Sequence, residues 1–155
     1  MQVQDLMTRD VSILNPYDNL ETAAIRMAEL DVGAFPVGED GRLVGMITDR
    51  DIVVRGLAEG LDATARVKDV MTPEVKYCYA DQHIGEISAN MAVAQVRRLP
   101  VLDRNKRMVG ILSLSDMAAV APAADIAEAL AGISRPAGDV ILNAAMSYQD
   151  RNRTV

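Results

Sequence analysis

Two short motifs in this 155-residue chain place a hydroxyl and a carboxylate three residues apart. Thr48 and Asp51 form the first pair, and Ser113 and Asp116 form the second. Each pair follows an apolar stretch with a glycine, where we expect a strand to end and a helix to begin. The start of a helix favours an anion, and a carboxylate accepts strong hydrogen bonds from hydroxyl groups. The pairs could therefore hold a ligand that carries negative charge and hydroxyl groups.

The same pairs also fit a capping box, with Asp in place of the usual Glu. The hydroxyl then caps the helix, and the carboxylate bonds back to the backbone of the capping residue. An Asp in the first helical turn contributes about 0.3–1 kcal/mol and needs no ligand. Both roles remain open, and they are compatible because one Asp can both cap and bind.

Basic residues near the motifs differ between the two copies. Arg50 lies between Thr48 and Asp51 and could pair with a phosphate or with a neighbouring carboxylate. Arg98 begins an expected strand, where neighbouring side chains point to opposite faces. It either faces a cleft or is a solvated edge-strand charge.

Most catalytic chemistry is excluded by the residue types present. The chain has one His and one Cys, and it shows no catalytic triad, metal-ligand spacing or phosphate-binding loop. We expect Cys78 to be a buried inert thiol and His83 to lie beside the start of a helix. The sequence thus predicts a protein that is not an enzyme and holds no metal.

Composition also argues against two classes of partner. The net charge is −6, which disfavours nucleic acid and anionic membrane surfaces. Met1–Asp5 lacks the features of a secretory leader, and no run of 18 apolar residues is present. We expect a cytoplasmic protein that binds neither nucleic acid nor membrane.

The motifs belong to an internal repeat. Asp5-Leu6-Met7-Thr8 returns as Asp69-Val70-Met71-Thr72 at an offset of 64, and Phe35-Pro36-Val37 returns as Leu99-Pro100-Val101. The glycine motifs follow at an offset of 65, because one extra residue falls in the turn at 103–106. Insertions belong in loops, so the shift supports a duplicated unit.

Each copy has the pattern of a β-α-β-β-α unit, an α+β fold. Since a unit of this size alone buries little surface, we expect both to pack sheet to sheet around one core. Asp18 and Glu21 should cap the first helix. The expected strands are 11–14, 34–37, 43–47, 75–79, 98–102 and 108–112. The expected domains are repeat 1 with its connector at 1–64, repeat 2 at 65–121, and a helical extension at 122–155.

In the extension, Asp125 is predicted to cap a helix over 126–131 that Gly132 ends. A further short helix is predicted over 140–146. The role of 134–155 stays open.

The repeated motifs resemble the CBS domain. Gly45-Met46-Ile47-Thr48-Asp49-Arg50-Asp51 and Gly110-Ile111-Leu112-Ser113-Leu114-Ser115-Asp116 carry the resemblance, with the Asp-x-Met-Thr openings, over residues 3 to 121. It implies two CBS repeats paired with pseudo-two-fold symmetry as a Bateman module, commonly as a homodimer. Such modules bind AMP, ADP, ATP, S-adenosylmethionine or NAD between the repeats and regulate another protein.

The resemblance also implies roles for single residues. Asp51 and Asp116 match the ribose-binding positions. Thr48 and Ser113 match the phosphate side, with Arg50 and Arg98 as nearby cations. Adenine would lie near Ala34, Phe35, Leu99 and Pro100.

We therefore expect a non-catalytic sensor that requires no cofactor and takes an adenine nucleotide as its regulatory ligand. AMP or ADP is favoured over ATP, because an acidic protein holds fewer phosphates more easily. The regulated protein would act in trans. One alternative is an interaction or structural module that binds no ligand, and another is a nucleotide-processing enzyme. The two clefts are expected to differ, because their flanking charges differ.

Overall fold

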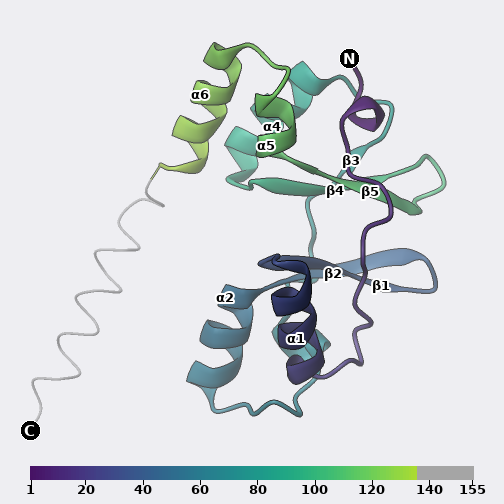
Figure 1. Cartoon of the computed structure of the whole chain (residues 1–155), viewed down its shortest axis with the longest axis vertical. Coiled ribbons are helices and arrows are strands. Elements are labelled where there is room, and N and C mark those ends of the chain that lie inside the picture. Colours follow the sequence, from purple (N-terminus) through teal and green to yellow (C-terminus); the bar gives the residue numbers. More distant parts are fainter. Residues whose placement is uncertain (136–155) are drawn as a thin grey trace, which may run out of the picture.

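The computed structural model describes residues 1–135, which form two similar units (Figure 1). Residues 136–155, and with them the helix expected at 140–146, lie outside this range. The elements of the first unit are α1 (Leu20–Leu30), β1 (Ala34–Glu39), β2 (Arg42–Thr48), α2 (Asp49–Asp51), the π-helical turn η2 (Ile52–Gly56), the 3-10 turn η3 (Leu57–Glu59) and α3 (Val67–Val70). The others are the 3-10 turn η1 (Val3–Asp5), β3 (Cys78–Tyr79), α4 (Ile84–Ala94), β4 (Arg98–Leu102), β5 (Met108–Ser113), α5 (Leu114–Ala118) and α6 (Ala123–Ile133).

The predicted helices α1 and α4 are confirmed, each with a buried apolar stripe. Leu20, Ala23 and Met27 are buried on α1. The predicted capping box of α1 is wrong. Asn19 caps the helix, since its Oδ1 accepts a 2.7 Å hydrogen bond from the N–H of Thr22. The carboxylate of Asp18 is instead engaged by the N–H of Asn15, which closes the preceding turn.

Both predicted hairpins are confirmed, and their register positions the motifs. β1 pairs antiparallel with β2, and β4 pairs antiparallel with β5. Thr48 lies opposite Ala34, and Ser113 lies opposite Arg98. Each motif hydroxyl is therefore placed beside the first residue of its own hairpin.

The first strand of each unit is much shorter than the predicted ranges, 11–14 and 75–79. In the first unit only Leu14 joins the sheet, donating to the carbonyl of Pro36 and accepting from the N–H of Gly38. The next parallel pairing toward the N-terminus would need an N–H from Pro36, which proline lacks. Pro100 ends the pairing of β4 with β3 at Cys78 in the same way. The proline of each copy thus frees the backbone that precedes the strand.

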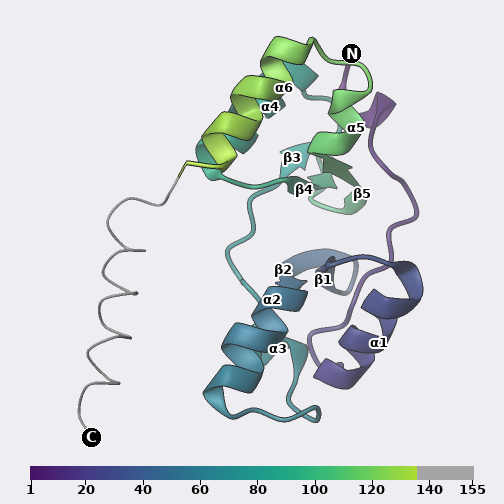
Figure 2. The same ribbon diagram turned by 60° about the vertical axis from the view of Figure 1, so that its left-hand side comes forward.

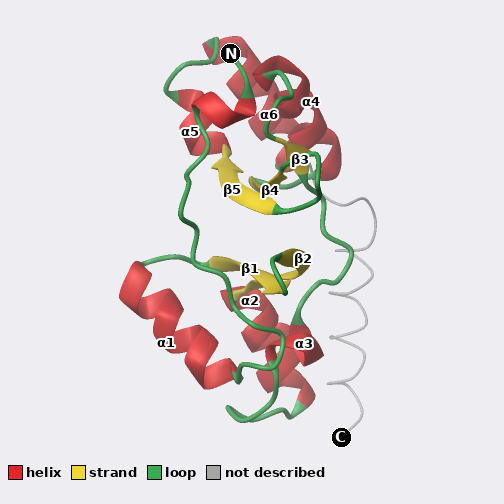
Figure 3. Cartoon of the chain, turned by 90° about the vertical axis from the view of Figure 1, so that its right-hand side faces the viewer, coloured by secondary structure: helices red, strands yellow, loops and turns green. Residues whose placement is uncertain are grey.

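The two units bury separate cores, so the expectation of one shared core is wrong. Figure 3 shows the two hairpins facing each other, with the helices on the outer sides. Each sheet is covered by its own helices, which bury its apolar face within its own unit. One core consists of Leu14, Leu20, Ala23, Met27, Phe35, Val37, Ile47, Val67 and Val70. The other consists of Val3, Met7, Cys78, Ile84, Ile87, Met91, Leu99, Val101, Leu112, Leu114, Met117 and Ala129.

Leading segments cross between the units. Val3 and Met7 from the N-terminus are buried in the second core, and Val67 and Val70 of α3 are buried in the first. The backbone of Thr8 exchanges two hydrogen bonds with Ile111 of β5. Thr72 does the same with Met46 of β2. The core of each unit is therefore completed by the segment that leads into the other unit.

The C-terminal helix α6 lies along α4 (Figure 2). Its predicted bounds are wrong at both ends, because it runs from Ala123 to Ile133 with Pro122 before it. Asp125 lies in the first turn rather than at the cap. Gly132 does not end the helix. A Cβ built on it would lie 2.7 Å from the Cβ of Ala92, so glycine is required there for close packing against α4.

Candidate functional site

Both hydroxyl–carboxylate pairs form capping boxes. The N–H of Asp116 donates to Ser113 Oγ over 3.2 Å, and Asp116 Oδ2 accepts from the N–H of Ser113 over 2.8 Å. Thr48 and Asp51 make the same two bonds at 3.1 and 2.9 Å. The capping role is thus present in both repeats, and it uses one oxygen of each carboxylate.

The second oxygen of each carboxylate has different surroundings in the two repeats. Within residues 1–135, Asp116 Oδ1 accepts no hydrogen bond, while Ser113 Oγ donates to Oδ2 over 2.7 Å. In the first repeat, Asp51 Oδ1 lies 4.0 Å from Nη1 of Arg55. The same Nη1 donates to Oγ1 of Thr72 over 3.3 Å. An arginine is therefore at ion-pair distance from Asp51, whereas Asp116 forms no ion pair with any residue of 1–135.

A cleft of about 360 Å³ opens next to Asp116, and both repeats line it. It lies within the range of about 300–1,000 Å³ that is usual for small-molecule sites. Five residues singled out from the sequence meet here. They are Ala34 and Phe35 of β1, Arg98 of β4, and Ser113 and Asp116 of the second motif.

The other predicted site residues do not line this cleft. Thr48 and Asp51 belong to the motif of the first repeat. Arg50 is exposed, and its backbone N–H donates to Asp49 Oδ1 over 2.8 Å. Leu99 is 3% exposed and lies in the second core, and Pro100 is also buried. The side chains of Leu99 and Pro100 thus serve packing.

Sequence reasoning missed the segment that forms one wall of the cleft. Thr8, Asp10, Val11 and Ser12 all line it. Within the part of the chain that the structure describes, the N–H groups of Val11 and Ser12 have no hydrogen-bond partner. The signal for this wall was the proline of β1, because Pro36 cannot continue the pairing that would engage Ser12.

The cleft is apolar on one side and charged on the other. Val32, Ala34 and Ile111 contribute apolar surface, and Phe35 lies behind them in the first core. The charged residues that line it are Asp10, Asp116 and Arg98. One cation against two carboxylates suits a ligand with hydroxyl groups and little negative charge.

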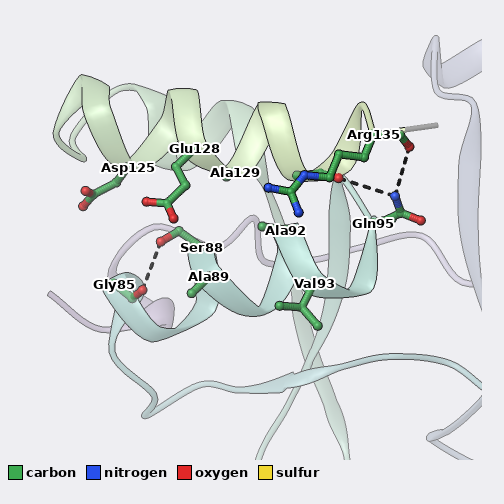
Figure 4. A pocket seen from close by; sticks show the side chains of 11 residues that line it. Gly85, Ser88, Ala89, Ala92, Val93, Gln95, Asp125, Glu128, Ala129 and Arg135 are labelled. Atoms are coloured by element: carbon green, nitrogen blue, oxygen red, sulfur yellow. Dashed lines mark hydrogen bonds between the residues drawn. The ribbon is translucent and has the colours of Figure 1, made fainter. Parts of the chain in front are cut away.

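A larger cavity of about 580 Å³ lies between α4 and α6 (Figure 4). It holds none of the predicted site residues. Two of its polar side chains bond to backbone carbonyls of its own walls: Ser88 Oγ donates to Gly85, and Gln95 Nε2 donates to Gly132 and Arg135. The charged side chains of Asp125, Glu128 and Arg135 line it without a hydrogen bond or ion pair within residues 1–135. We therefore interpret it as a groove between packed helices.

The part of the chain that the structure describes has neither a metal-ligand cluster nor a membrane-spanning helix. Among residues 1–135, no three His, Cys, Asp or Glu side chains gather as a metal site would require. None of the helices found there is long and apolar enough to cross a bilayer.

Two curated proteins of similar length resemble the chain. CBS domain-containing protein YhcV of Bacillus subtilis is 41% identical over 116 residues, covering 75% of this chain and 82% of that protein. Hypoxic response protein 1 of Mycobacterium tuberculosis is 39% identical over 135 residues, covering 86% of this chain and 94% of that protein.

Solved structures give the same fold. The crystal structure of Hypoxic Response Protein I with two coordinated zinc ions has a TM-score of 0.71 at 40% identity, and the match covers 79% of this chain and 100% of that one. CBSX2 in complex with AMP has a TM-score of 0.69 at 24% identity, covering 76% of this chain and 93% of that one. At that identity the second likeness shows the fold alone.

The family model of the CBS domain matches residues 3–56 and 67–123, one match for each repeat. These ranges include the crossing segments, both hairpins and both capping-box motifs. Because the model matches most of the chain and the fold agrees, this α+β protein belongs to the CBS domain family, as a tandem pair of CBS repeats.

Proposed function

We propose that this chain is a non-catalytic regulatory module that binds an adenosine-containing ligand between its two repeats. AMP and ADP fit best, and ATP, NAD and S-adenosylmethionine are the other members of the class. One observation carries the proposal. Within residues 1–135, the cleft beside Asp116 combines a carboxylate oxygen without a hydrogen-bond partner, an apolar wall and backbone N–H groups without a partner. CBSX2, which shares this fold, was solved with AMP.

The ribose has a suitable partner in Asp116. The bonds from Ser113 to Oδ2 fix the orientation of this carboxylate. Oδ1 is left to accept protons from the ribose hydroxyls, in charge-assisted hydrogen bonds. Because the carboxylate is held before the ligand arrives, little side-chain freedom is lost on binding. Asp51 is the corresponding residue of the first repeat.

The adenine fits the apolar side of the cleft. Val32 and Ala34 offer apolar surface for the flat base, while Phe35, which is 2% exposed, supports this wall from the core beneath it. The free N–H groups of Val11 and Ser12 can donate to acceptor nitrogens on the edge of the ring. For the motif of the first repeat, the segment at Leu99 and Pro100 in β4 of the second repeat corresponds to this wall.

The phosphate side explains the preference for AMP or ADP. Arg98 is the one cation among the residues that line the cleft, and Asp10 and Asp116 bring negative charge. Since the hydroxyl of Ser113 already donates to Asp116, a phosphate would compete for it. Thr48 and Arg50 are the matching phosphate-side residues of the first repeat. Each further phosphate would add repulsion.

The position of the cleft suggests how binding is signalled. A ligand there would touch both repeats and favour the arrangement of the repeats that binds it best. A partner protein in trans would sense that change, as would the equilibrium of a homodimer. Native mass spectrometry of the purified chain would report ligand mass and oligomeric state together.

Calorimetry tests the proposal. AMP, ADP, ATP, NAD and S-adenosylmethionine are titrated into the full chain, with GMP as the control for the base. We expect AMP or ADP to bind most tightly, and GMP more weakly because its base edge presents different donors and acceptors. Failure of every adenosine compound to bind at millimolar concentration would refute the proposal. Chromatography after incubation with ATP or NAD should show no product.

A further inference from the structure

Arg55 makes contacts in the first repeat that have no equivalent in the described part of the second. It belongs to η2, which follows directly after the capping box of Thr48 and Asp51. Its Nη1 lies 4.0 Å from Asp51 Oδ1 and donates to Oγ1 of Thr72 over 3.3 Å. The side chain of Asp51 is only 17% exposed, so this guanidinium covers the open edge of a largely enclosed carboxylate.

The repeat symmetry shows what these contacts replace. Thr72 corresponds to Thr8, and Asp51 corresponds to Asp116. Thr8 and Asp116 both line the cleft of the second motif, where Asp116 Oδ1 has no partner within residues 1–135. Val120 stands at the position that matches Arg55, and it cannot pair with a carboxylate. The second motif therefore lacks the contact that the first one makes.

A second position differs in the same direction. Lys76 corresponds to Ser12, which lines the cleft of the second motif. At this matching position a long cationic side chain stands in place of a small neutral one. The residue that matches this part of the cleft wall is therefore larger and positively charged.

We propose that Arg55 closes the first-repeat site, so that each chain takes one adenosine ligand, at the Asp116 cleft. A ribose needs the oxygen of Asp51 that faces Arg55. To reach it, a ligand must first break the contacts of Arg55 with both Asp51 and Thr72. This inference rests on the proposed function, and it assigns the specificity between the two sites to one residue.

The test counts sites on the full chain with AMP, by equilibrium dialysis and calorimetry. The unaltered chain should bind one AMP, and Asp116→Asn should weaken that site at least tenfold. Arg55→Val, which installs the residue of the second repeat, should bind two. Adding Asp51→Asn to Arg55→Val should remove the newly opened site at Asp51 and leave the site at Asp116. Arg55→Gln keeps the length of the side chain without its charge, and it should also show two sites.

Arg104→Val is the matched control, because Arg104, in the turn between β4 and β5, is also an arginine paired with an aspartate, Asp81. It should keep one site. Two sites in the unaltered chain, or one site in both Arg55 variants, would overturn the inference and leave the proposed function standing. Weaker binding without a second site in the Arg55 variants would make Arg55 a ligand contact and overturn it too. Absence of binding by the unaltered chain and every variant refutes the proposed function itself.

Discussion

Replacing Asp116 with Asn separates the two roles that this carboxylate can have. Oδ2 accepts from the N–H and the hydroxyl of Ser113 at 2.8 and 2.7 Å, while Oδ1 has no partner within residues 1–135. Asn keeps one oxygen for the N–H of Ser113 but places an NH₂ donor where Oδ1 was. The helix cap should therefore survive, and the acceptor for a ribose should be lost.

The expected magnitudes follow from these contacts. A hydrogen bond to a charged group contributes about 1.5–3 kcal/mol, against roughly 0.5–1.5 kcal/mol for a neutral one. Loss of the charged acceptor should thus weaken AMP binding by about 10- to 100-fold. The free energy of unfolding of Asp116→Asn should fall by less than about 1 kcal/mol, since mainly the charge at the helix start is lost. Asp116→Ala also removes the carboxylate half of the capping box, which should lower the free energy of unfolding by about 1–2 kcal/mol.

The assay combines urea unfolding with calorimetry on both variants. Asp69→Asn is the matched control, because Asp69 makes the same backbone bond, to the N–H of Arg66, at the start of α3. It should leave AMP binding unchanged. If Asp116→Asn bound AMP as tightly as the unaltered chain while Asp116→Ala lost only stability, Asp116 would be a cap and nothing more.

Three further predictions concern the fold. A Cβ on Gly110 would lie 2.8 Å from both the sulfur of Met7 and the carbonyl oxygen of Thr8. Gly110→Ala should therefore lower the free energy of unfolding by about 1–3 kcal/mol in urea titrations. Gly85→Ala, with its nearest neighbour at 3.8 Å, should instead raise it by about 0.4–1 kcal/mol, and equal effects would contradict the packing argument. Burial raises the pKa of Cys78 to about 12. A thiol reagent at pH 8 should therefore label this residue only after unfolding. The stability that the buried neutral thiol contributes should decline as pH rises from the ordinary thiol pKa of about 8.5 toward 12. Arg104 lowers the pKa of Asp81 by donating two 2.8 Å hydrogen bonds to its carboxylate. NMR titration should show this lowered pKa, and Arg104→Ala should return it to the ordinary value. The stability from this pair should be present at neutral pH and lost as pH falls through the lowered pKa.

Local patterns predicted the elements whose causes are local. The apolar stripes of α1 and α4, the two hairpins and both capping boxes follow from spacing of a few residues, and the structure contains all of them. The prediction for the N-cap of α1 is wrong because Asp and Asn are both common capping residues, and Asp18 and Asn19 are adjacent. The choice between them depends on the turn that Asp18 closes with Asn15.

The sequence singled out five of the residues that line the cleft, but neither the wall at Val11 and Ser12 nor the way in which the five meet. Asp116, Ser113 and Arg98 share one hairpin and the helix after it, so their proximity is local. That Ala34 and Phe35 of the other repeat meet them is a tertiary fact. The wall at Val11 and Ser12 arises because Pro36 stops the sheet, which a strand propensity alone does not reveal.

By itself the sequence determined the duplication, the β-α-β-β-α order and the two capping motifs, because these depend on period, spacing and side-chain type. Only the tertiary structure decided that the cores are separate, that the leading segments cross, that Arg55 also bonds to Thr72, and that Asp116 lines a cleft with residues of the other repeat. These features depend on which distant segments meet in space. The two motifs differ by few residues, and it is their surroundings that make one carboxylate paired and the other free.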